Sequence, residues 1–206
     1  MPSDEEGTWD LRDAANIVAN MNAGARETGL TFALERAEAL AVDDERYSKI
    51  ATTSAGDRAA TLYYVSTGHV TNTVIDVVVV NPEPATFVGG WGETDAPLRT
   101  LGVWPVITIS TRVARSREPH WITHELGHVL GFYDTTYYEA VPRINARYTR
   151  CGLSVATTTY AKASAPLGAR ENFMSYDVDK RRSFFTDGYD PAYRNVIACW
   201  ARTSGL

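Results

Sequence analysis

The sequence is most constrained by an eleven-residue segment, HELGHVLGFYD at positions 124–134, in which two histidines stand four residues apart. On a helix with about 3.6 residues per turn, His124 and His128 stack on one face, so both imidazoles can reach one metal ion at about 2.0–2.1 Å. Glu125 is turned by about 100° from His124 and can lie over a water molecule without binding the ion itself. The spacing therefore predicts a helix that presents two metal ligands and a general base.

The remainder of the segment predicts a third ligand. A continuing helix would carry later side chains away from the ion, but Gly131 can adopt the left-handed conformation that ends a helix. The chain can then turn and bring Asp134 back to the metal, which leaves the fourth position of a tetrahedral zinc ion to water, as in catalytic sites. The alternative is that two core-facing histidines and a glutamate share this spacing by chance.

Segment 124–134 resembles the extended zinc motif of the metzincin clan of metallopeptidases, whose third ligand is usually histidine but is aspartate in the snapalysin family. Residues 172–176, NFMSY, resemble the methionine turn of that clan, and residues 184–189, FFTDGY, stand where the clan enters its C-terminal helix. IDVVVVNP at 75–82 and VGGWG at 88–92 are similar to the strand and substrate edge of the pappalysin family in particular. The resemblance covers residues 62–190.

This resemblance implies an α+β fold. A twisted mixed β-sheet with a backing helix and an active-site helix would lie above a loop-rich C-terminal lobe with a methionine turn and a terminal helix. A length of 206 residues and 44% hydrophobic content suit one catalytic domain over residues 1–206. Its N-terminal lobe would comprise residues 1–131 and its C-terminal lobe residues 132–206.

Two further residues take roles from the resemblance. Met174 would lie beneath the zinc ion, and the alternative is an ordinary buried methionine that fills an irregular gap. Tyr176 resembles a tyrosine that some metzincins swing toward the tetrahedral oxyanion, where a phenol stabilises negative charge. The alternative is a packed tyrosine with a satisfied hydroxyl.

The implied activity is that of a zinc metalloendopeptidase acting on protein or peptide substrates. Zinc would polarise the scissile carbonyl, and Glu125 would take a proton from the attacking water and deliver it to the leaving amine. Two other classes stay open: a zinc hydrolase of a non-peptide amide, and a zinc-stabilised binding module without turnover. A binding module would gain nothing from Glu125 and would close the fourth metal position with protein.

Hydrophobic spacing predicts the elements around the site. Apolar side chains at helical spacing over residues 9–27 predict an amphipathic helix behind a sheet. Alternation over residues 30–38 predicts a half-buried strand. Further strands are expected at residues 62–65, 74–80 and 106–110.

Two features refine the expected sheet. The run Val77–Val80 lacks polar alternation, so its strand should be covered on both faces. Gly89, Gly90 and Gly92 surround Trp91 and mark either an edge to which an extended peptide adds or an ordinary glycine-rich loop.

The two cysteines, Cys151 and Cys199, both follow the predicted zinc helix. A disulfide that ties the loop region to the C-terminal helix suits a secreted peptidase, while two reduced thiols or a cysteine zinc ligand are the alternatives. The acidic N-terminus carries no signal-peptide pattern, so secretion would require that a signal and any pro-segment were removed before this chain begins.

The net charge and the length of the apolar runs limit which classes of partner the chain can have. A formal net charge of −5 argues against a nucleic-acid groove, and the longest apolar run is far too short for a membrane span. A monomer is expected. His120, just before the zinc motif, is expected to cap or pack rather than to bind metal.

The charged clusters outside the motif are expected on the solvated surface. They are Arg143, Arg147, Arg150, Lys180, Arg181 and Arg182 among the basic residues, and Asp177, Asp179, Asp187 and Asp190 among the acidic ones. Arg181 and Arg182 lie just past the methionine turn, where the resemblance places a pocket wall, so a role in substrate preference stays open. The aspartates match no EF-hand loop, and calcium binding is the alternative that the pappalysin likeness leaves open.

Overall fold

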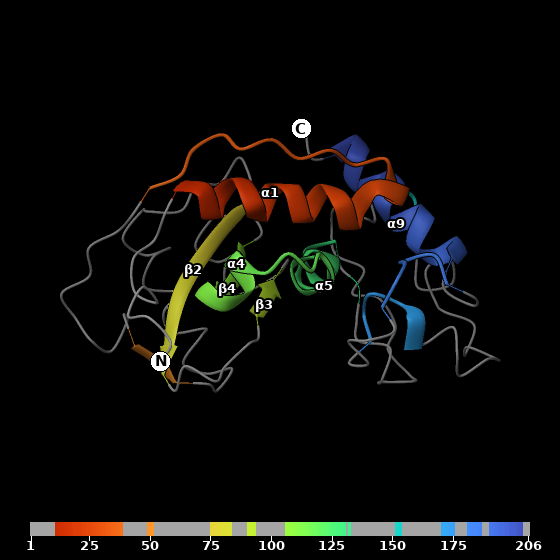
Figure 1. The fold of residues 1–206 in the computed structure, drawn as a ribbon. Coiled ribbons are helices and arrows are strands. Elements are labelled where there is room, and N and C mark those ends of the chain that lie inside the picture. The colour runs from red at the N-terminus through yellow and green to blue at the C-terminus, as the bar shows by residue number, and fades with distance from the viewer. Residues whose placement is uncertain are drawn as a thin grey trace.

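The computed structural model describes residues 11–38, 49–51, 75–83, 90–93, 106–130, 132, 151–153, 170–175, 181–186 and 190–203. In chain order the elements are α1 (Leu11–Ala25), the short 3-10 helix η1 (Arg26–Thr28), β1 (Lys49–Ala51), β2 (Asp76–Glu83), β3 (Gly90–Glu93), β4 (Val106–Ser110), α4 (Thr111–Arg115), α5 (His120–Val129) and α9 (Asp190–Thr203). The expected α+β class is confirmed, with α1 spanning one face of the molecule above the strands and α5 (Figure 1).

The strands form a four-stranded mixed sheet in the order β1-β2-β4-β3. β2 pairs in parallel with β1 and β4, whereas β3 pairs antiparallel with β4, with Trp91 opposite Thr108. All five residues of β4 are buried, and residues 75–79 around the start of β2 are half-buried at successive positions. The strands expected at 74–80 and 106–110 are therefore confirmed, and Gly90–Glu93 forms a strand at one edge of the described sheet.

α1 confirms the helix expected over residues 9–27. Its inward side chains Ala14, Ile17, Met21 and Ala25 recur at helical spacing and are buried. Gly24 packs tightly against α5, since a Cβ at this position would lie 1.7 Å from Thr123 Oγ1. Gly29, at φ 77°, then ends the 3-10 turn that follows α1.

Residues 30–38 are not the predicted strand. They run back along α1 without joining the sheet (Figure 1). The Asn22 side chain takes the place of a partner strand at Phe32: it accepts a hydrogen bond from Phe32 N at 2.8 Å and donates one to Phe32 O at 2.9 Å. Neither of the two large apolar side chains of this segment is fully buried: Phe32 is half-buried and Leu34 is 49% exposed.

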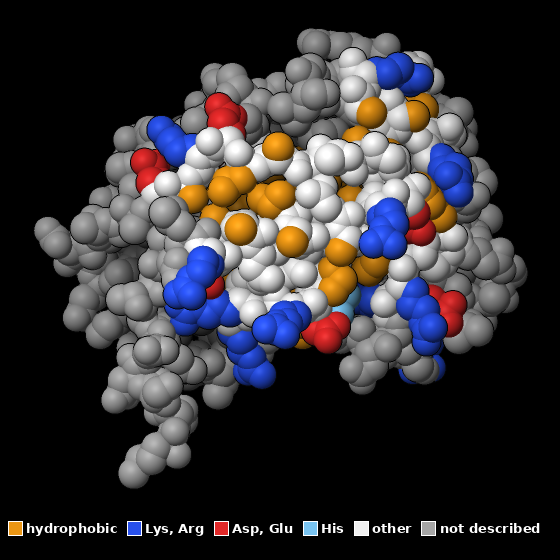
Figure 2. Space-filling view, turned by 45° about the horizontal axis from the view of Figure 1, so that its top comes forward, with side chains coloured by type: hydrophobic (Ala, Val, Ile, Leu, Met, Phe, Trp, Pro, Cys, Tyr) orange, Lys and Arg blue, Asp and Glu red, His pale blue; other side chains and the backbone are white. Residues whose placement is uncertain are grey.

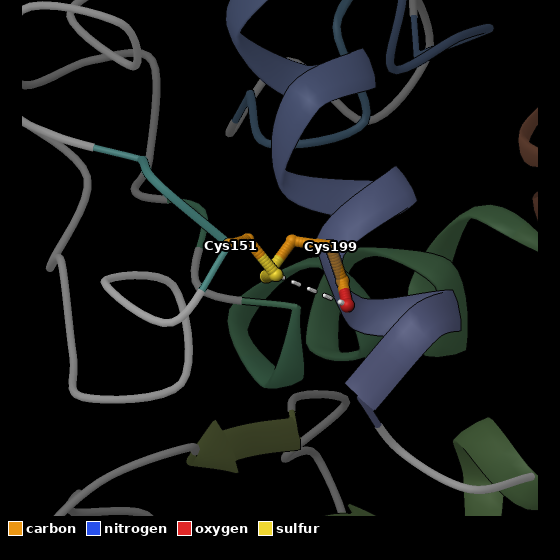
Figure 3. Close-up of a disulfide and its surroundings, with 2 residues drawn as sticks. All are labelled: Cys151 and Cys199. Atoms are coloured by element: carbon orange, nitrogen blue, oxygen red, sulfur yellow. Dashed lines mark hydrogen bonds between the residues drawn. A yellow bond between two sulfur atoms is a disulfide. The ribbon is translucent and has the colours of Figure 1, made fainter.

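The C-terminal helix α9 is held by the expected disulfide. Cys151 and Cys199 are bonded with their Cα atoms 5.7 Å apart, and Cys199 projects from α9 toward the segment 151–153 (Figure 3). Val196, Ile197 and Cys199 are buried in the same core cluster as Leu126 and Met174. The alternatives of two reduced thiols or a cysteine metal ligand are therefore wrong.

Of the remaining predictions, the strand at 62–65 and the residues Arg143, Arg147, Arg150, Asp177, Asp179, Lys180 and Asp187 lie outside the described residues. Among the helices that the structure describes, none is long and apolar enough to cross a bilayer. On the face shown in Figure 2, charged side chains of the described residues surround a central area with apolar groups, and several of the basic ones gather at the lower left.

Candidate metal centre

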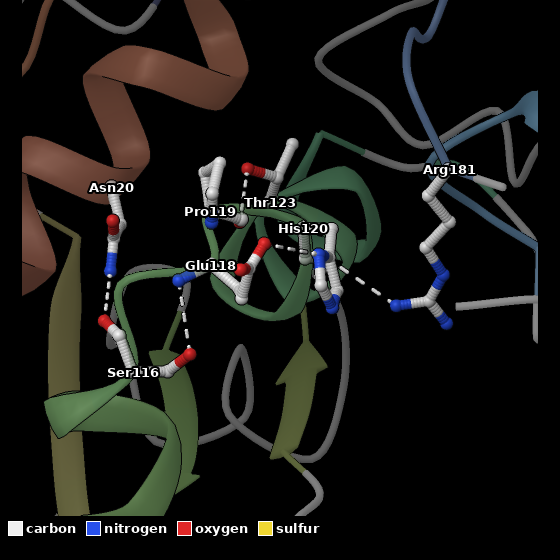
Figure 4. Close-up of polar contacts among 7 residues, drawn as sticks. All are labelled: Asn20, Ser116, Glu118, Pro119, His120, Thr123 and Arg181. Carbon is white, nitrogen blue, oxygen red and sulfur yellow. Dashed lines mark hydrogen bonds and ion pairs between the residues drawn. The ribbon is translucent and has the colours of Figure 1, made fainter. Parts of the chain in front are cut away.

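The segment that leads into α5, the helix with the HELGH sequence, is bonded to α1. Asn16 Nδ2 donates to Ala114 O at 2.7 Å and to Ser116 O at 2.8 Å, and Asn20 Nδ2 donates to Ser116 O at 2.7 Å (Figure 4). These bonds satisfy carbonyl groups of the turn between α4 and α5, which would otherwise be orphaned at the end of α4. α1 thereby fixes where α5 begins.

The first turn of α5 carries its own hydrogen bonds. Pro119 is the residue before the helix, where its missing N–H costs no hydrogen bond. Its carbonyl accepts from Thr123 N at 3.0 Å and from Thr123 Oγ1 at 2.7 Å (Figure 4). His120 opens the helix half-buried, with Nδ1 3.6 Å from Glu118 Oε2, and so packs at the helix start as predicted.

The structure brings together the three predicted residues of α5. His124 and Glu125 are 5% and 7% exposed, and His128 is half-buried. The two imidazole rings lie with centroids 4.8 Å apart and planes at 87°, as expected for neighbours one helical turn apart. Glu125 is therefore a buried carboxyl group beside a pair of neighbouring histidines.

The hydrogen bonds of the two rings test whether they suit a metal. His124 Nδ1 lies 2.8 Å from Phe173 O, and His128 Nδ1 lies 3.0 Å from Phe132 O. A carbonyl oxygen only accepts, so each Nδ1 carries the proton and each Nε2 presents its lone pair. Metal-binding histidines are held in the same way, by an acceptor on the nitrogen that does not bind the ion. The pair therefore fits a metal ion.

The turn beneath α5 is built by Asn172. Ser175 N donates to Asn172 O at 2.9 Å, which closes the turn, and Met174 N donates to Asn172 Oδ1 at 2.9 Å. The Asn172 amide donates to Phe184 O at 2.9 Å and to Thr186 Oγ1 at 3.0 Å. Asn172 is fully buried, so these bonds hold the turn in one conformation.

Met174 lies directly against α5. It is fully buried, and a Cβ at Gly127 would lie 2.1 Å from Met174 Sδ and 2.9 Å from a ring carbon of Phe184. The glycine inside the motif thus leaves the space that the methionine and Phe184 occupy. The turn also supplies the Phe173 carbonyl that orients His124.

Several residues of this site were not found from the sequence. Gly127 carried a signal, since a glycine in a buried helix is costly unless something approaches closely. The carbonyls of Phe173 and Phe132 carried none, because any residue supplies a carbonyl. Of the predicted site residues, Gly131, Asp134 and Tyr176 lie outside the described part of the chain.

One surface prediction is wrong. Arg181 is not solvated but 8% exposed, because its guanidinium donates to the backbone of the turn and of α5. Arg182 is exposed as expected. Among the described residues, no group of three or more histidine, cysteine or acidic side chains could hold a metal ion, and the third predicted ligand, Asp134, lies outside them.

α5 thus carries two histidines whose Nδ1 atoms lie at carbonyl oxygens and a buried glutamate, and Met174 packs against it from the turn at residues 172–175. The sequence profile of the dual-action HEIGH metallo-peptidases matches residues 56–157, a segment that contains the sheet strands β2, β3 and β4 and all of α5. Residues 124–128 read HELGH, with the buried Leu126 in place of the isoleucine that the family name spells.

Residues 56–157 thus match the HEIGH metallo-peptidase family, and the chain is a metallopeptidase that hydrolyses peptide bonds. The alternatives of a non-peptide amide hydrolase and of a binding module without turnover thus gain no support. No curated protein and no solved structure matches the chain.

Proposed function

We propose that the chain is a secreted zinc metalloendopeptidase in which His124, His128 and Asp134 hold one catalytic zinc ion and Glu125 is the general base. The observation that carries this proposal is the pair of bonds from His124 Nδ1 to Phe173 O and from His128 Nδ1 to Phe132 O. Both bonds select the tautomer whose Nε2 binds metal. A carboxylate oxygen from Asp134 would complete the three protein ligands of a catalytic site.

When bound, zinc supplies Lewis-acid chemistry by polarising the scissile carbonyl and acidifying the attacking water. Glu125 accepts a proton from that water on its carboxylate and then delivers it to the nitrogen of the leaving amine. Its burial at 7% exposure keeps bulk water from competing for the proton. No covalent enzyme intermediate is required.

The substrate lies as an added strand on β3. β3 is the edge strand of the described sheet, pairing antiparallel with β4 on one side, and it contacts α5. An extended peptide can bond to the outer edge of such a strand through its main chain, which places its carbonyls beside the motif helix. Gly90 and Gly92 allow a close approach of the two backbones.

In this proposal the chain is related to the pappalysin family. Its third zinc ligand is an aspartate of the snapalysin type, and one catalytic domain has a metzincin-like fold. Support comes from the segment HELGHVLGFYD and from Met174 in a turn against α5. Tyr176 stabilises the oxyanion in this proposal, and calcium at the acidic residues after the turn is a secondary feature.

The Cys151–Cys199 disulfide fits an oxidising compartment and hence secretion. The working unit is a monomer.

The test is to incubate an unfolded protein mixture with wild-type protein and with Glu125→Gln, and to identify new peptide ends by mass spectrometry. New ends should appear with wild type, disappear with a zinc chelator, return on addition of zinc, and be absent with Glu125→Gln. Glu35→Gln, at an exposed carboxylate, is the matched control and should cleave like wild type. Equal cleavage by wild type and Glu125→Gln would refute the assigned base.

A further inference from the structure

We propose that Arg181 is a positioning residue for the metal ligand His124, because its guanidinium binds the backbone on both sides of the His124–Phe173 hydrogen bond. The inference rests on the proposed function, since it assigns a role at the same metal centre. It concerns a residue that neither touches the reacting atoms nor belongs to the zinc motif.

Arg181 reaches two structural units. Its Nε donates to Ser175 O, the last residue of the turn that carries Phe173 and Met174. Its Nη1 lies 3.5 Å from His120 O, and Figure 4 shows the side chain extended toward that residue at the start of α5. The guanidinium carbon also lies 5.8 Å from the centre of the Trp121 ring, within the range of a cation–π contact.

These two units hold the two ends of the His124–Phe173 bond. His120 is one helical turn before His124 on α5, so its carbonyl belongs to the backbone turn that carries His124. Ser175 N bonds to Asn172 O, so Ser175 and the Phe173 carbonyl belong to one closed turn. A group that bonds both units fixes the distance between the imidazole donor and its acceptor.

The side chain has to be arginine for this role. A guanidinium presents several N–H donors in a rigid plane, so one side chain can bond two carbonyls in different directions and still lie over an aromatic ring. A lysine ammonium at the same place is a point charge on a flexible stem and fixes no such angle. At 8% exposure the cation gives up most of its hydration, and the carbonyls replace that hydration with directed bonds.

The test is zinc affinity, measured by competition with a chromophoric chelator on full-length wild-type protein, Arg181→Ala and Arg181→Lys. Loss of a group bonded directly to a metal ligand typically weakens metal binding by about 10- to 100-fold, and Arg181→Ala, which acts through the backbone, should fall near the lower end of that range. Arg181→Lys should lie between wild type and Arg181→Ala, and it provides the measurement if Arg181→Ala does not fold. Added methylguanidinium should restore zinc affinity to Arg181→Ala but not to Arg181→Lys.

Arg182 provides the matched control. It is the next residue, also an arginine, and its side chain is exposed, while its backbone N–H bond to Glu171 O at 2.8 Å survives substitution. Arg182→Ala should bind zinc like wild type. In zinc-free protein, nitrogen NMR shifts of His124 should report one tautomer in wild type and Arg182→Ala, and a mixture in Arg181→Ala.

The outcomes separate the two proposals. Wild-type protein that binds no zinc would overturn the proposed function and the role of Arg181 with it. Wild type that binds zinc while Arg181→Ala and Arg181→Lys bind it equally tightly would overturn the positioning role alone. Unchanged zinc affinity with an altered cleavage preference would replace positioning by a direct substrate contact.

Discussion

Gly127 and Met174 lie in contact at the centre of the site, so closely that a methyl group on Gly127 would be 2.1 Å from Met174 Sδ. The glycine stands between His124 and His128 on α5, and the methionine is in the turn whose Phe173 carbonyl orients His124. The distance between the motif helix and the turn is therefore set by the absence of a side chain at one position.

Gly127→Ala should destabilise the fold and weaken zinc binding together. Helix propensity favours alanine by about 1 kcal/mol, but overpacking a filled core costs about 1–3 kcal/mol, and both Met174 and Phe184 are fully buried and have little room to move. We expect a net loss of unfolding free energy in urea and a weaker zinc affinity than wild type. The double variant Gly127→Ala/Met174→Ala should recover part of the zinc affinity, and an undisturbed single variant would contradict the contact.

Gly24→Ala should destabilise the protein through the contact between α1 and α5. A Cβ at Gly24 would lie 1.7 Å from Thr123 Oγ1 and 2.7 Å from Thr123 Cβ, which forces the helices apart. Although alanine gains about 1 kcal/mol of helix propensity over glycine, an overlap of this size outweighs it. Thermal unfolding should show a lower Tm for Gly24→Ala.

Ala23→Gly is the control for that substitution, because it makes the reverse exchange at the neighbouring position. Ala23 is the preceding residue of α1 and is exposed. Glycine there should lower the free energy of unfolding by about 1 kcal/mol through helix propensity alone, and the Tm should fall accordingly. The control thus measures the stability that Gly24→Ala would gain from helix propensity if no side chain lay against position 24. If Gly24→Ala raised the Tm by as much as Ala23→Gly lowers it, the close approach of Gly24 to Thr123 would be wrong.

The local elements could be predicted because their signals lie within one element. The HELGH spacing placed both histidines on one helical face, and the apolar segments at 74–80 and 106–110 identified β2 and β4. The segment 30–38 was mispredicted because Asn22, ten residues before Phe32, satisfies the backbone groups that a strand partner would have bonded. Local alternation contains no information about that side chain.

The buried state of Arg181 could not be predicted for the same physical reason. Its partners are the carbonyls of Ser175 and His120. Every residue has a backbone carbonyl, so the sequence does not identify which ones bond to Arg181. The tautomer of His124 likewise depends on Phe173 O, 49 residues away. The motif therefore predicts which histidines would bind metal, whereas the orientation of their rings is set by tertiary structure.

Asn172→Ala should open the turn beneath α5. The substitution removes the acceptor for Met174 N and the donor to Phe184 O and Thr186 Oγ1, and leaves these groups buried without their partner. Each such group costs about 1–3 kcal/mol, so a loss of several kcal/mol in the free energy of unfolding is expected. Asn172→Asp keeps the acceptor for Met174 N but buries a carboxylate whose oxygen faces Phe184 O with no proton between them, so chemical denaturation should place it well below wild type as well.

The Glu27 carboxylate should secure the segment after the turn. Glu27 Oε2 accepts a hydrogen bond from Ser183 Oγ at 2.6 Å, and Oε1 accepts one from Phe184 N, so η1 is tied to the residue whose ring packs against Gly127. Because Glu27 is itself exposed, Glu27→Ala should lower the free energy of unfolding by only about 1 kcal/mol. Glu38→Ala, at an exposed carboxylate paired at the surface with Arg36, should change it little. Equal effects of the two substitutions in urea denaturation would contradict the bridge.

Reduction of the Cys151–Cys199 disulfide should lower stability without removing the metal centre. The bond closes a loop over a sequence separation of 48 residues, and the chain-entropy model assigns about 4 kcal/mol to a loop of that length. Its sulfur atoms bind α9 to segment 151–153, whereas His124 and His128 are oriented by carbonyls of residues 173 and 132. The double variant Cys151→Ser/Cys199→Ser should therefore unfold at a lower temperature and still bind one zinc ion below its Tm. Loss of zinc binding in the folded double variant would mean that the disulfide positions the ligands themselves.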